Sequence, residues 1–325
     1  MTTAETLGLA PLVGDLERVE TRLLASVRHD DRFLAEVGAH LITAGGKRIR
    51  PTLTLCSAYA AGGPSTPAHD DVITGAAACE LVHLGSLYHD DVIDEAETRR
   101  GVPSVNARWS NIVAILSGDF LLARASSLAA SLGADVAGLL ADTIGELCRG
   151  QVLELQHLYD VTRSEEDYTS AIEGKTAALF ATASRVGGMV ARVDEPTLDA
   201  LTRYGHHLGL CFQIIDDVLD LTADEETLGK PAGQDLVEGI YTLPVISALA
   251  EDASLAEHLG GPLDRERCDE VRRRVASTGA VAATLAIARD HATKANEALA
   301  GAHGLDDIVT DRLRTLVDGL VDRDR

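Results

Sequence analysis

Apolar residues recur every three or four positions along most of this chain, which is the period of an α-helix and not of a β-strand. Alanine, leucine and valine dominate, and aromatic residues make up only 3% of the chain, a composition that also favours helices. Two long helices are predicted within residues 69–94 and 199–221. Gly, Pro or Asp interrupts the pattern at residues 45–46, 61–67, 99–104, 132–135, 193–196, 229–234 and 259–262. We therefore expect an all-α protein.

The chain has the size and hydrophobic content of a globular protein with a substantial core. It holds 325 residues, of which 46% are hydrophobic and 25% charged. No repeat of fixed period, no low-complexity tract and no long polar linker divides it. We therefore expect one domain spanning residues 1–325.

The net charge of −22 argues against a nucleic-acid-binding surface, which needs many lysines and arginines gathered on one face. Any phosphate that the protein binds must therefore be held locally. The first twenty residues carry acidic side chains and lack a basic start followed by an apolar core, and no run of about 18 uncharged apolar residues occurs. We expect a cytoplasmic protein without a transmembrane segment.

The five cysteines are scattered and form no CxxC pair or metal-ligand spacing. Free cysteine commonly behaves as a small buried apolar residue in a reducing compartment. We expect that role for all five.

Three aspartates stand close together in the segment LYHDDVIDEAETRRG, at Asp90, Asp91 and Asp94. On a helix these positions cluster within about one turn, and their carboxylates repel one another unless a cation lies between them. A solvated acidic helix face would explain one such motif. The segment FQIIDDVLD repeats the spacing at Asp216, Asp217 and Asp220, again directly after an apolar run. The repetition in two apolar settings favours metal binding over a solvated face.

Magnesium is the metal that such short clusters suit. It keeps several waters and is typically bound by one or two carboxylates together with substrate phosphates. Two such half-sites on facing helices could bind a diphosphate from both sides through bridging Mg²⁺ ions. The ions would neutralise the charge that develops on the diphosphate as it leaves.

Basic residues near these motifs agree with a diphosphate ligand. The segment GGKRIRP places Lys47, Arg48 and Arg50 in a glycine-rich turn just before a helix that opens at Pro51, a favourable anion site. Five further residues near the aspartate motifs are also candidate diphosphate ligands. Each of them alone would be interpreted as an ordinary surface group, and only their occurrence together indicates a site. These candidates are Arg99, Arg100, Lys175, Thr176 and Lys230.

Two further polar residues share a helix face with the aspartates. His83 precedes Asp90 by seven residues, which is two helical turns, and Gln213 precedes Asp216 by three. A lone histidine is as often structural as functional, so its role stays open at this point.

In their order and spacing, the segments GGKRIRP, LVHLGSLYHDDVID with RRG, LSGD, GKTAALF, FQIIDDVLD and GKPAGQDL resemble those of the trans-isoprenyl (polyprenyl) diphosphate synthases. The resemblance covers most of the chain. It implies the isoprenoid synthase fold, a single large all-helical bundle around a deep central apolar cavity. It also implies a homodimer.

The resemblance implies a head-to-tail condensation of isopentenyl diphosphate with an allylic diphosphate, in the presence of Mg²⁺, with three ions when the allylic diphosphate is bound. The implied metal residues are Asp90, Asp91, Asp94, Asp216 and Asp220, with Asp217, Lys175 and Lys230 completing the catalytic set. The residues implied to bind isopentenyl diphosphate are Gly46, Lys47, Arg50, His83 and Arg100. Those implied to bind the allylic diphosphate are Arg99, Lys175, Thr176, Gln213 and Lys230. Many members of the family carry a lysine where this chain has Ile240, which removes one possible diphosphate contact.

Small residues precede the first aspartate motif and bear on product length. Gly85 and Ser86 lie about one turn before Asp90 on the helix, and Val82 lies beneath them. In the resembled family aromatic side chains at such positions stop the growing chain early. We therefore expect a product of roughly thirty-five to fifty carbons, of the kind used for quinone side chains. The alternative is that these residues only permit helix packing.

Other interpretations account for part of the sequence. A short-chain farnesyl or geranylgeranyl diphosphate synthase would share the chemistry, and a non-catalytic subunit of a heteromeric synthase would usually lose aspartates from one motif. A terpene cyclase would need no counterpart of GGKRIRP. A di-iron carboxylate bundle would use Glu-x-x-His pairs such as Glu80 with His83 and Glu154 with His157, but two further bridging glutamates are not identifiable. Peripheral membrane contact during product release is a further expectation.

Overall fold

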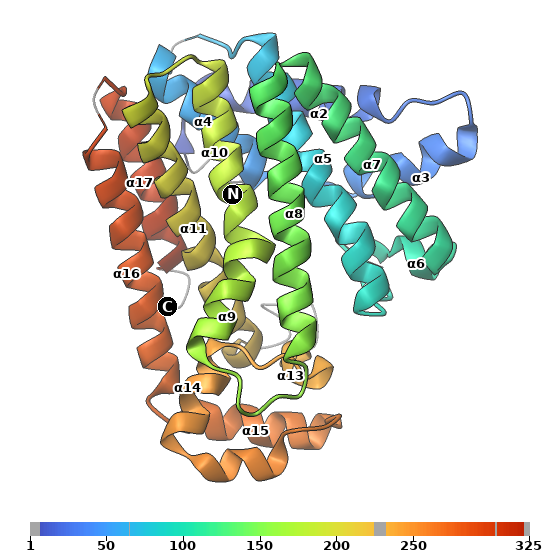
Figure 1. Ribbon diagram of the computed structural model, residues 1–325, viewed down its shortest axis with the longest axis vertical. Coiled ribbons are helices and arrows are strands. Elements are labelled where there is room, and N and C mark those ends of the chain that lie inside the picture. The colour runs from blue at the N-terminus through green and yellow to red at the C-terminus, as the bar shows by residue number, and fades with distance from the viewer. Residues whose placement is uncertain (1–6, 65, 224–231, 303, 322–325) are drawn as a thin grey trace. The chain divides into compact units, whose positions relative to one another are not determined.

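The computed structural model describes residues 7–64, 66–223, 232–302 and 304–321, and it is almost entirely helical there (Figure 1). The elements are α2 (Leu12–Ser26), α3 (Arg32–Thr43), α4 (Ile49–Gly62), α5 (Asp70–Ile93), β1 (Thr98–Arg99), β2 (Val102–Pro103), α6 (Val105–Arg108), α7 (Asn111–Ser131), α8 (Ala134–Gln156), α9 (Glu165–Ile172), the π-helix η1 (Glu173–Ala177), α10 (Ala178–Val190), α11 (Glu195–Thr222), α13 (Gln234–Glu238), α14 (Leu243–Glu251), the 3₁₀-helix η2 (Ala253–His258), α15 (Arg265–Ser277), α16 (Ala280–Ala300) and α17 (Asp307–Val321). The all-α prediction is confirmed. So are the two long predicted helices, which are α5 and α11.

The chain divides into two compact units. The first comprises the described parts of Met1–Ile144, Leu179–Gly205 and Leu299–Leu316, and the second those of Gly145–Ala178, His206–Ala298 and Val317–Arg325. The expectation of one domain over 1–325 stays a prediction.

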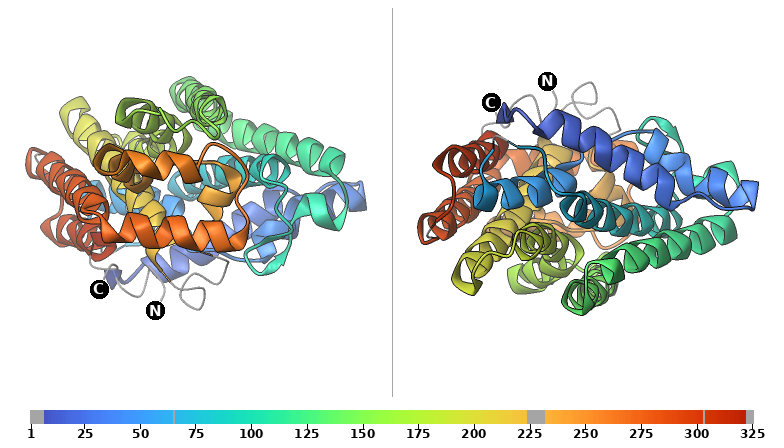
Figure 2. Two further views of the ribbon diagram at one scale, coloured as in Figure 1. Left: turned by 90° about the horizontal axis from the view of Figure 1, so that it is seen from below. Right: turned by 90° about the horizontal axis from the view of Figure 1, so that it is seen from above.

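Helix α5 is the central helix of the first unit. It is buried around most of its circumference, because apolar and small residues occupy every face of its middle turns. It packs against α2, α4 and α7, and the seen-from-above panel of Figure 2 shows α5 and α7 side by side. A glycine permits the closest approach to α10: a Cβ atom added at Gly75 would lie 2.6 Å from a methyl group of Val186. Helix α5 is therefore held by a densely packed scaffold.

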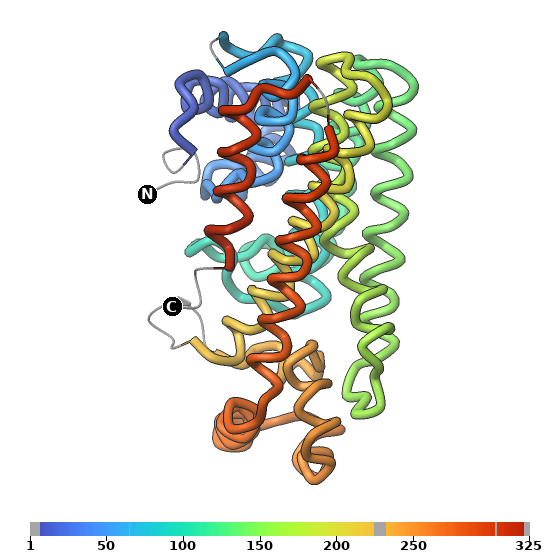
Figure 3. The backbone as a smooth tube through the Cα atoms, turned by 90° about the vertical axis from the view of Figure 1, so that its left-hand side faces the viewer, coloured from blue at the N-terminus to red at the C-terminus, as the bar shows by residue number. Residues whose placement is uncertain are grey.

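The second unit has a core of its own. It contains Leu221 at the end of α11, Tyr241 before α14, Val245 in α14 and Val271 in α15. Helix α16 runs alongside α11 (Figure 3), and the Nδ1 atoms of His207 and His291 face each other across this contact at 3.2 Å. This packing fixes the part of α11 that carries the second aspartate motif.

Helix α7 has an uncovered apolar stripe. Ile112, Ile115 and Leu116 are 70%, 44% and 62% exposed. Of the helices in the described ranges, α7 alone is long and apolar enough to cross a membrane, on length and composition only, with 33% of its apolar window buried. It also carries Asp119 and Arg124, and Arg124 donates to the carbonyl oxygen of Ser26 at 2.5 Å.

The cysteine prediction holds at four positions and is wrong at one. Cys56, Cys79, Cys211 and Cys268 are buried free thiols, whereas Cys148 is exposed on α8. The periodic pattern around Cys148 does not distinguish a core-facing from a solvent-facing turn of that long helix.

Candidate active site

The first aspartate cluster lies in the last turn of α5. Asp94 is the C-cap residue, and its amide donates to the carbonyl oxygen of Asp90 at 2.8 Å, so the helix holds both aspartates one turn apart. Both side chains are partly exposed. Asp91 is fully buried, and Arg99 Nε donates to its Oδ1 at 2.6 Å. Burial raises the pKa of Asp91, while Arg99 opposes that shift.

A tight hairpin positions Arg99. Strands β1 and β2 pair through Thr98 with Pro103 and Arg99 with Val102. The two residues of the turn, Arg100 and Gly101, have φ of 55° and 76°, which is the left-handed conformation that a two-residue hairpin of the primed type requires. The hairpin directs Arg99 to Asp91 and also brings it within 4.0 Å of Asp94.

Lys47, Arg48 and Arg50 form what we call the basic turn, which runs from the loop after α3 into the first turn of α4. Helix α4 begins at Ile49, two residues before the predicted start at Pro51. Lys47 is exposed, Arg48 is buried, and the guanidinium of Arg50 lies over the ring of Phe180 at 4.8 Å from its centroid. Burial lowers the pKa of Arg50 to about 10, with the like charge of Arg100 adding to the effect. Arg50 therefore remains charged at neutral pH and can bind an anion.

His83 belongs electrostatically to the same cluster. Burial and the charges of Arg50 and Arg100 lower the pKa of His83 well below its ordinary value. The imidazole is therefore neutral at pH 7, and it can offer an anion a hydrogen bond but no charge. The structure thus brings Arg50 and Arg100 close to His83, which lies on α5, the helix that also carries Asp90.

The residues expected to set product length differ in their surroundings. Val82 and Gly85 are buried, and Ser86 is partly exposed with its hydroxyl donating to the carbonyl oxygen of His83. A Cβ atom added at Gly85 would lie 3.1 Å from the carbonyl oxygen of Gly118 and equally close to Leu122, both on α7. Gly85 therefore serves the packing of α5 on α7, which was the alternative interpretation, whatever its further role.

The second aspartate cluster lies near the end of α11, in the second unit. Asp216 is exposed, and Asp217 and Asp220 are buried. Asp217 accepts hydrogen bonds from Tyr168 Oη at 2.6 Å and from Gln213 Nε2 at 2.8 Å. Burial raises the pKa of Asp217 to about 7, against the opposing effect of these two donors.

Gln213 and Asp220 link this cluster to its surroundings. Gln213 Oε1 accepts a hydrogen bond from Thr176 Oγ1 at 2.7 Å, so one predicted site residue orients another. Asp220 Oδ2 accepts a hydrogen bond from the backbone amide of Asp235 at 3.2 Å. The carbonyl oxygen of Asp235 in turn accepts a hydrogen bond from the amide of Ile240 at 2.8 Å. The segment around Ile240 is thereby tied to the aspartate helix through its backbone.

Lys175 and Thr176 project from the π-helix η1. This wide turn forms where α8 and the chain before α10 come very close: a Cβ atom added at Gly150 would lie 2.2 Å from the amide nitrogen of Lys175. Short π-helices are frequent at functional sites because they redirect side chains from a regular helix. The ammonium of Lys175 is paired with Glu154. Lys230 lies outside the described residues.

Several residues of the site were not predicted from the sequence. Tyr168, which holds Asp217, comes from α9 and carries no local motif. The sequence offers Glu154 and Glu80 only as ligands of the alternative di-iron centre. In the structure Glu154 is paired with Lys175, and Glu80 with Arg48 at 2.7 Å. Within the described ranges, no group of three or more His, Cys, Asp or Glu side chains is placed to hold a metal ion by itself.

Comparison with known proteins agrees with the fold and with the motifs. The polyprenyl synthetase family model matches residues 31–276. Nonaprenyl diphosphate synthase of Mycobacterium tuberculosis is 41% identical over 251 residues, which cover 76% of this chain and 74% of that protein. Heptaprenyl diphosphate synthase component 2 of Geobacillus stearothermophilus is 38% identical over 313 residues, or 95% of this chain and 91% of that one.

A solved structure extends the agreement to three dimensions. The crystal structure of a polyprenyl synthase from Caulobacter crescentus, complexed with calcium and isoprenyl diphosphate, superposes with a TM-score of 0.91 at 35% identity and covers 99% of this chain and 98% of its own. The chain therefore belongs to the polyprenyl synthetase family, with the all-α isoprenoid synthase fold. It is an enzyme of the trans-prenyltransferase class.

Proposed function

We propose that the protein condenses isopentenyl diphosphate head-to-tail with an allylic diphosphate and repeats this step to give a long all-trans polyprenyl diphosphate. The observation that carries the proposal is the pair of complete aspartate motifs, each of which has a buried carboxylate held by a neighbouring side chain. Asp91 and Asp217 are buried and held by Arg99 and Tyr168. Such fixed carboxylates orient a site, and a subunit that had lost catalysis would not need to retain them.

The donor set suits a hard divalent cation. Carboxylate oxygens from Asp90 and Asp94, one helical turn apart, and from Asp216 and Asp220 are the ligand type that Mg²⁺ takes together with phosphate oxygens. The calcium complex of the Caulobacter relative supports a divalent-ion site in this family. We assign Mg²⁺, three ions in all, to these residues, with Asp91 as a supporting member. When bound, the ions supply charge neutralisation to the departing diphosphate.

The protein's own groups bind and orient the two substrates. Lys47, Arg50 and Arg100 supply positive charge to the diphosphate of isopentenyl diphosphate, and neutral His83 supplies a hydrogen bond. Gly46 contributes by leaving room for the guanidinium of Arg100. The allylic diphosphate is assigned to Arg99, Lys175, Thr176, Gln213 and Lys230. Lys175 exchanges Glu154 for the diphosphate in this scheme, while Gln213 stays oriented by its bond from Thr176.

The reaction needs no nucleophilic side chain. The C1–O bond of the allylic diphosphate breaks heterolytically, and both electrons leave with the diphosphate. The terminal carbon of the isopentenyl double bond then attacks C1. A proton passes from the resulting cation to the released diphosphate, which restores the alkene. A deep apolar cavity that excludes water is part of the proposal, because water would otherwise trap the cation.

Long-chain products are proposed because small side chains precede the first motif, where an aromatic ring would stop growth. We expect roughly thirty-five to fifty carbons, suited to a quinone side chain. The relatives from M. tuberculosis and G. stearothermophilus carry names for products within this range.

We further propose that residues 1–325 act as one catalytic domain in a cytoplasmic homodimer. The uncovered stripe of Ile112, Ile115 and Leu116 on α7 supports self-association, since contiguous exposed apolar side chains mark interaction surfaces. Contact with a membrane would then be peripheral and limited to product release.

Product analysis tests the proposal. The purified protein is incubated with Mg²⁺, labelled isopentenyl diphosphate, and farnesyl or geranylgeranyl diphosphate in parallel. A ladder ending at about thirty-five carbons or more is expected. A stop at about fifteen or twenty carbons would retain the chemistry and overturn the long-chain assignment. No incorporation would favour a subunit that needs a second component.

A further inference from the structure

The residue between the two proposed diphosphate ligands Lys47 and Arg50 has an unusual conformation. Arg48 has φ 48° and ψ 39°, which is the left-handed helical region, and its side chain is only 6% exposed. A non-glycine residue is disfavoured in this region because its Cβ atom comes too close to the following carbonyl oxygen. The surrounding structure must therefore hold Arg48 in place.

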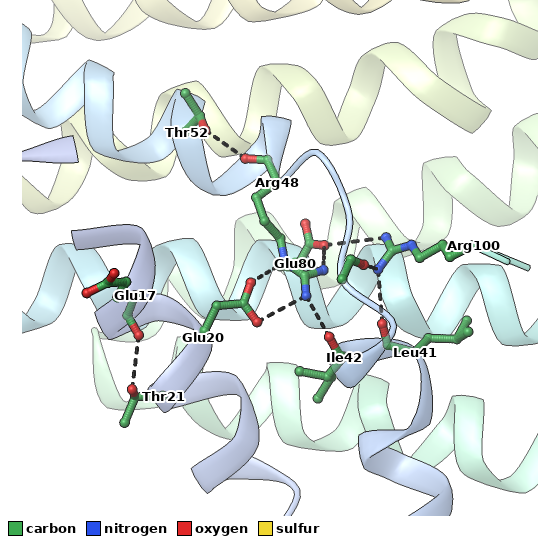
Figure 4. A network of polar contacts seen from close by, with 10 residues as sticks. Glu17, Glu20, Thr21, Leu41, Ile42, Arg48, Thr52, Glu80 and Arg100 are labelled. Atoms are coloured by element: carbon green, nitrogen blue, oxygen red, sulfur yellow. Dashed lines mark hydrogen bonds and ion pairs between the residues drawn. The ribbon is translucent and has the colours of Figure 1, made fainter. Parts of the chain in front are cut away.

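The guanidinium of Arg48 joins three helices at the base of the basic turn (Figure 4). Its Nη1 donates to Glu80 on α5 at 2.7 Å. Its Nη2 donates both to Glu20 on α2 at 3.1 Å and to the carbonyl oxygen of Ile42 near the end of α3 at 2.9 Å, and its Nε donates to Glu20 as well. Four N–H donors are thus engaged within the protein, so the planar fork has a single well-defined orientation.

A second arginine holds the turn from its other side. Arg100 Nη1 donates to the carbonyl oxygen of Leu41 at 3.1 Å and to that of Gly45, while its Nη2 lies 3.7 Å from Glu80 (Figure 4). The guanidinium packs directly over Gly46, where an added Cβ atom would lie 2.9 Å from Arg100 Cζ. The turn is therefore fixed between two arginines that share one carboxylate.

Charge explains why that carboxylate is present. Glu80 is 1% exposed, and a buried carboxylate without a partner would be strongly destabilising. Arg48 and Arg100 would repel each other without it, whereas Glu80 attracts both. The network therefore sets the distance and direction of the two arginines before any diphosphate binds.

We propose that Arg48, held by Glu80 and Glu20, is a positioning residue that presents Lys47 and Arg50 to the diphosphate of isopentenyl diphosphate. The inference rests on the proposed function of the basic turn. Arg48 acts through its neighbours, because its donors are engaged by protein groups and its side chain is buried. Its effect should fall on one substrate only, since none of the groups that the Arg48 side chain contacts is a proposed ligand of the allylic diphosphate.

The variants Arg48→Lys and Arg48→Gly separate this role from simple turn formation. Lysine keeps the charge but presents one point donor group and not a fork, so it cannot satisfy Glu80, Glu20 and Ile42 together. Glycine removes the cost of the left-handed conformation but also removes the fork. We expect both to raise the KM for isopentenyl diphosphate about tenfold or more, with the KM for the allylic substrate unchanged within about twofold. If Arg48 served only to form the turn, Arg48→Gly would have the same KM for isopentenyl diphosphate as the wild type.

A milder variant keeps the test decisive if the Arg48 variants fold poorly. Glu20 is 38% exposed in its side chain, so Glu20→Gln loosens Arg48 from the solvent side without opening the core. We expect Glu20→Gln to raise the KM for isopentenyl diphosphate about threefold and to leave that for the allylic substrate unchanged. In the double variant with Arg48→Lys, the rise in KM should be smaller than the product of the two single-variant rises. The matched control is Arg314→Lys, an exposed arginine paired with Asp311 at 3.0 Å in the same unit, which should change neither KM.

Three results would overturn the proposal. One is an unchanged KM for isopentenyl diphosphate in folded Arg48→Lys and Glu20→Gln. Another is an equal rise in KM for both substrates, which would indicate general loosening of the fold. A wild-type protein that never consumes isopentenyl diphosphate would overturn the proposed function as well, and this outcome is distinguishable because it precedes any comparison of variants.

Discussion

At the scale of single residues, Asp217 is a buried carboxylate of the second aspartate cluster, to which we assign the role of orienting the proposed Mg²⁺ site. Both of its oxygen atoms are occupied, by Tyr168 and by Gln213. The variant Tyr168→Phe removes one donor and little else, because the ring stays buried. We expect the Mg²⁺ concentration for half-maximal activity to rise roughly tenfold, as is typical when a supporting hydrogen bond of a metal site is lost.

The control for this change is Tyr204→Phe. Tyr204 is equally buried, and its hydroxyl donates to the carbonyl oxygen of Leu313 at 2.8 Å in the first unit. Metal titrations of activity that moved equally in both variants would show that Tyr168 only stabilises the fold.

Ser86 is a cleaner probe of product length than Gly85. A large side chain at Gly85 would meet the backbone of Gly118, so a change in product could follow from distortion of α7. Ser86 is partly exposed and its hydroxyl makes a bond only within its own helix. We expect Ser86→Phe to shorten the product by several isoprene units while the rate of the first condensation stays within about twofold, as measured by chromatography of labelled products. A ladder of unchanged length would place the end of the cavity elsewhere.

At the scale of helices, the contact between α8 and η1 determines where Lys175 and Thr176 lie. The variant Gly150→Ala places a methyl group 2.2 Å from the amide nitrogen of Lys175 and 2.6 Å from the carbonyl oxygen of Ala171. Backbone atoms cannot yield as a side chain would, so we expect a loss of about 1–3 kcal/mol in the free energy of unfolding and a raised KM for the allylic substrate. Denaturant titration and steady-state kinetics measure the two effects.

Gly145→Ala provides the matched control on the same helix. No atom lies within 4 Å of a Cβ added at Gly145. Alanine should therefore leave activity unchanged and raise stability slightly, by up to about 1 kcal/mol, because glycine is a poor helix former. Loss of activity in this variant would mean that helix α8 tolerates no substitution here, and the argument from close contact would fail.

The packing of α11 on α16 should make stability depend on pH. Burial lowers the pKa of His207 to about 4, with smaller contributions from His206, His291 and Lys294, and Asp290 opposes them. Between the ordinary histidine value of 6.5 and about 4, the unfolded chain binds more protons than the folded chain. The contribution of His207 to stability is therefore complete above pH 6.5 and is lost as the pH falls through that window.

Denaturant unfolding at several pH values tests this sign. The variant His207→Gln should show a shallower fall in stability below pH 6.5 than the wild type. His69→Gln serves as the control, because His69 is exposed at the start of α5, with 77% of its side chain accessible. Parallel curves for wild type and His207→Gln would contradict the prediction.

At the scale of the whole molecule, the features that depend on local sequence could be predicted, whereas those that depend on contacts between distant residues could not. The helical period is written into each segment, so the all-α class, α5 and α11 could be predicted without knowing their neighbours. The roles of Tyr168 and Glu80 could not, because each acts through a residue that is distant in sequence or hidden within an ordinary helical pattern. The sequence leaves open whether Gly85 lines a cavity or permits helix packing, and only the structure shows that it packs against Gly118.

The self-association of the molecule is the last testable consequence. Ile112, Ile115 and Leu116 stand at the i, i+3, i+4 spacing of one helix face, and they remain exposed in a chain whose net charge of −22 otherwise favours a well-solvated surface. Burial of such a stripe between two copies would stabilise a dimer by the hydrophobic effect. We expect the wild type to have twice its chain mass of 34.3 kDa in light scattering, and the double variant Ile112→Glu, Leu116→Glu to have the mass of one chain. Ile308→Glu on α17 is the control: this residue is 59% exposed but stands outside the stripe, so the variant should remain a dimer.

A wild-type monomer, or a double variant that keeps the dimeric mass, would contradict the prediction and assign the stripe to another partner. Sedimentation with lipid vesicles would then be the next experiment.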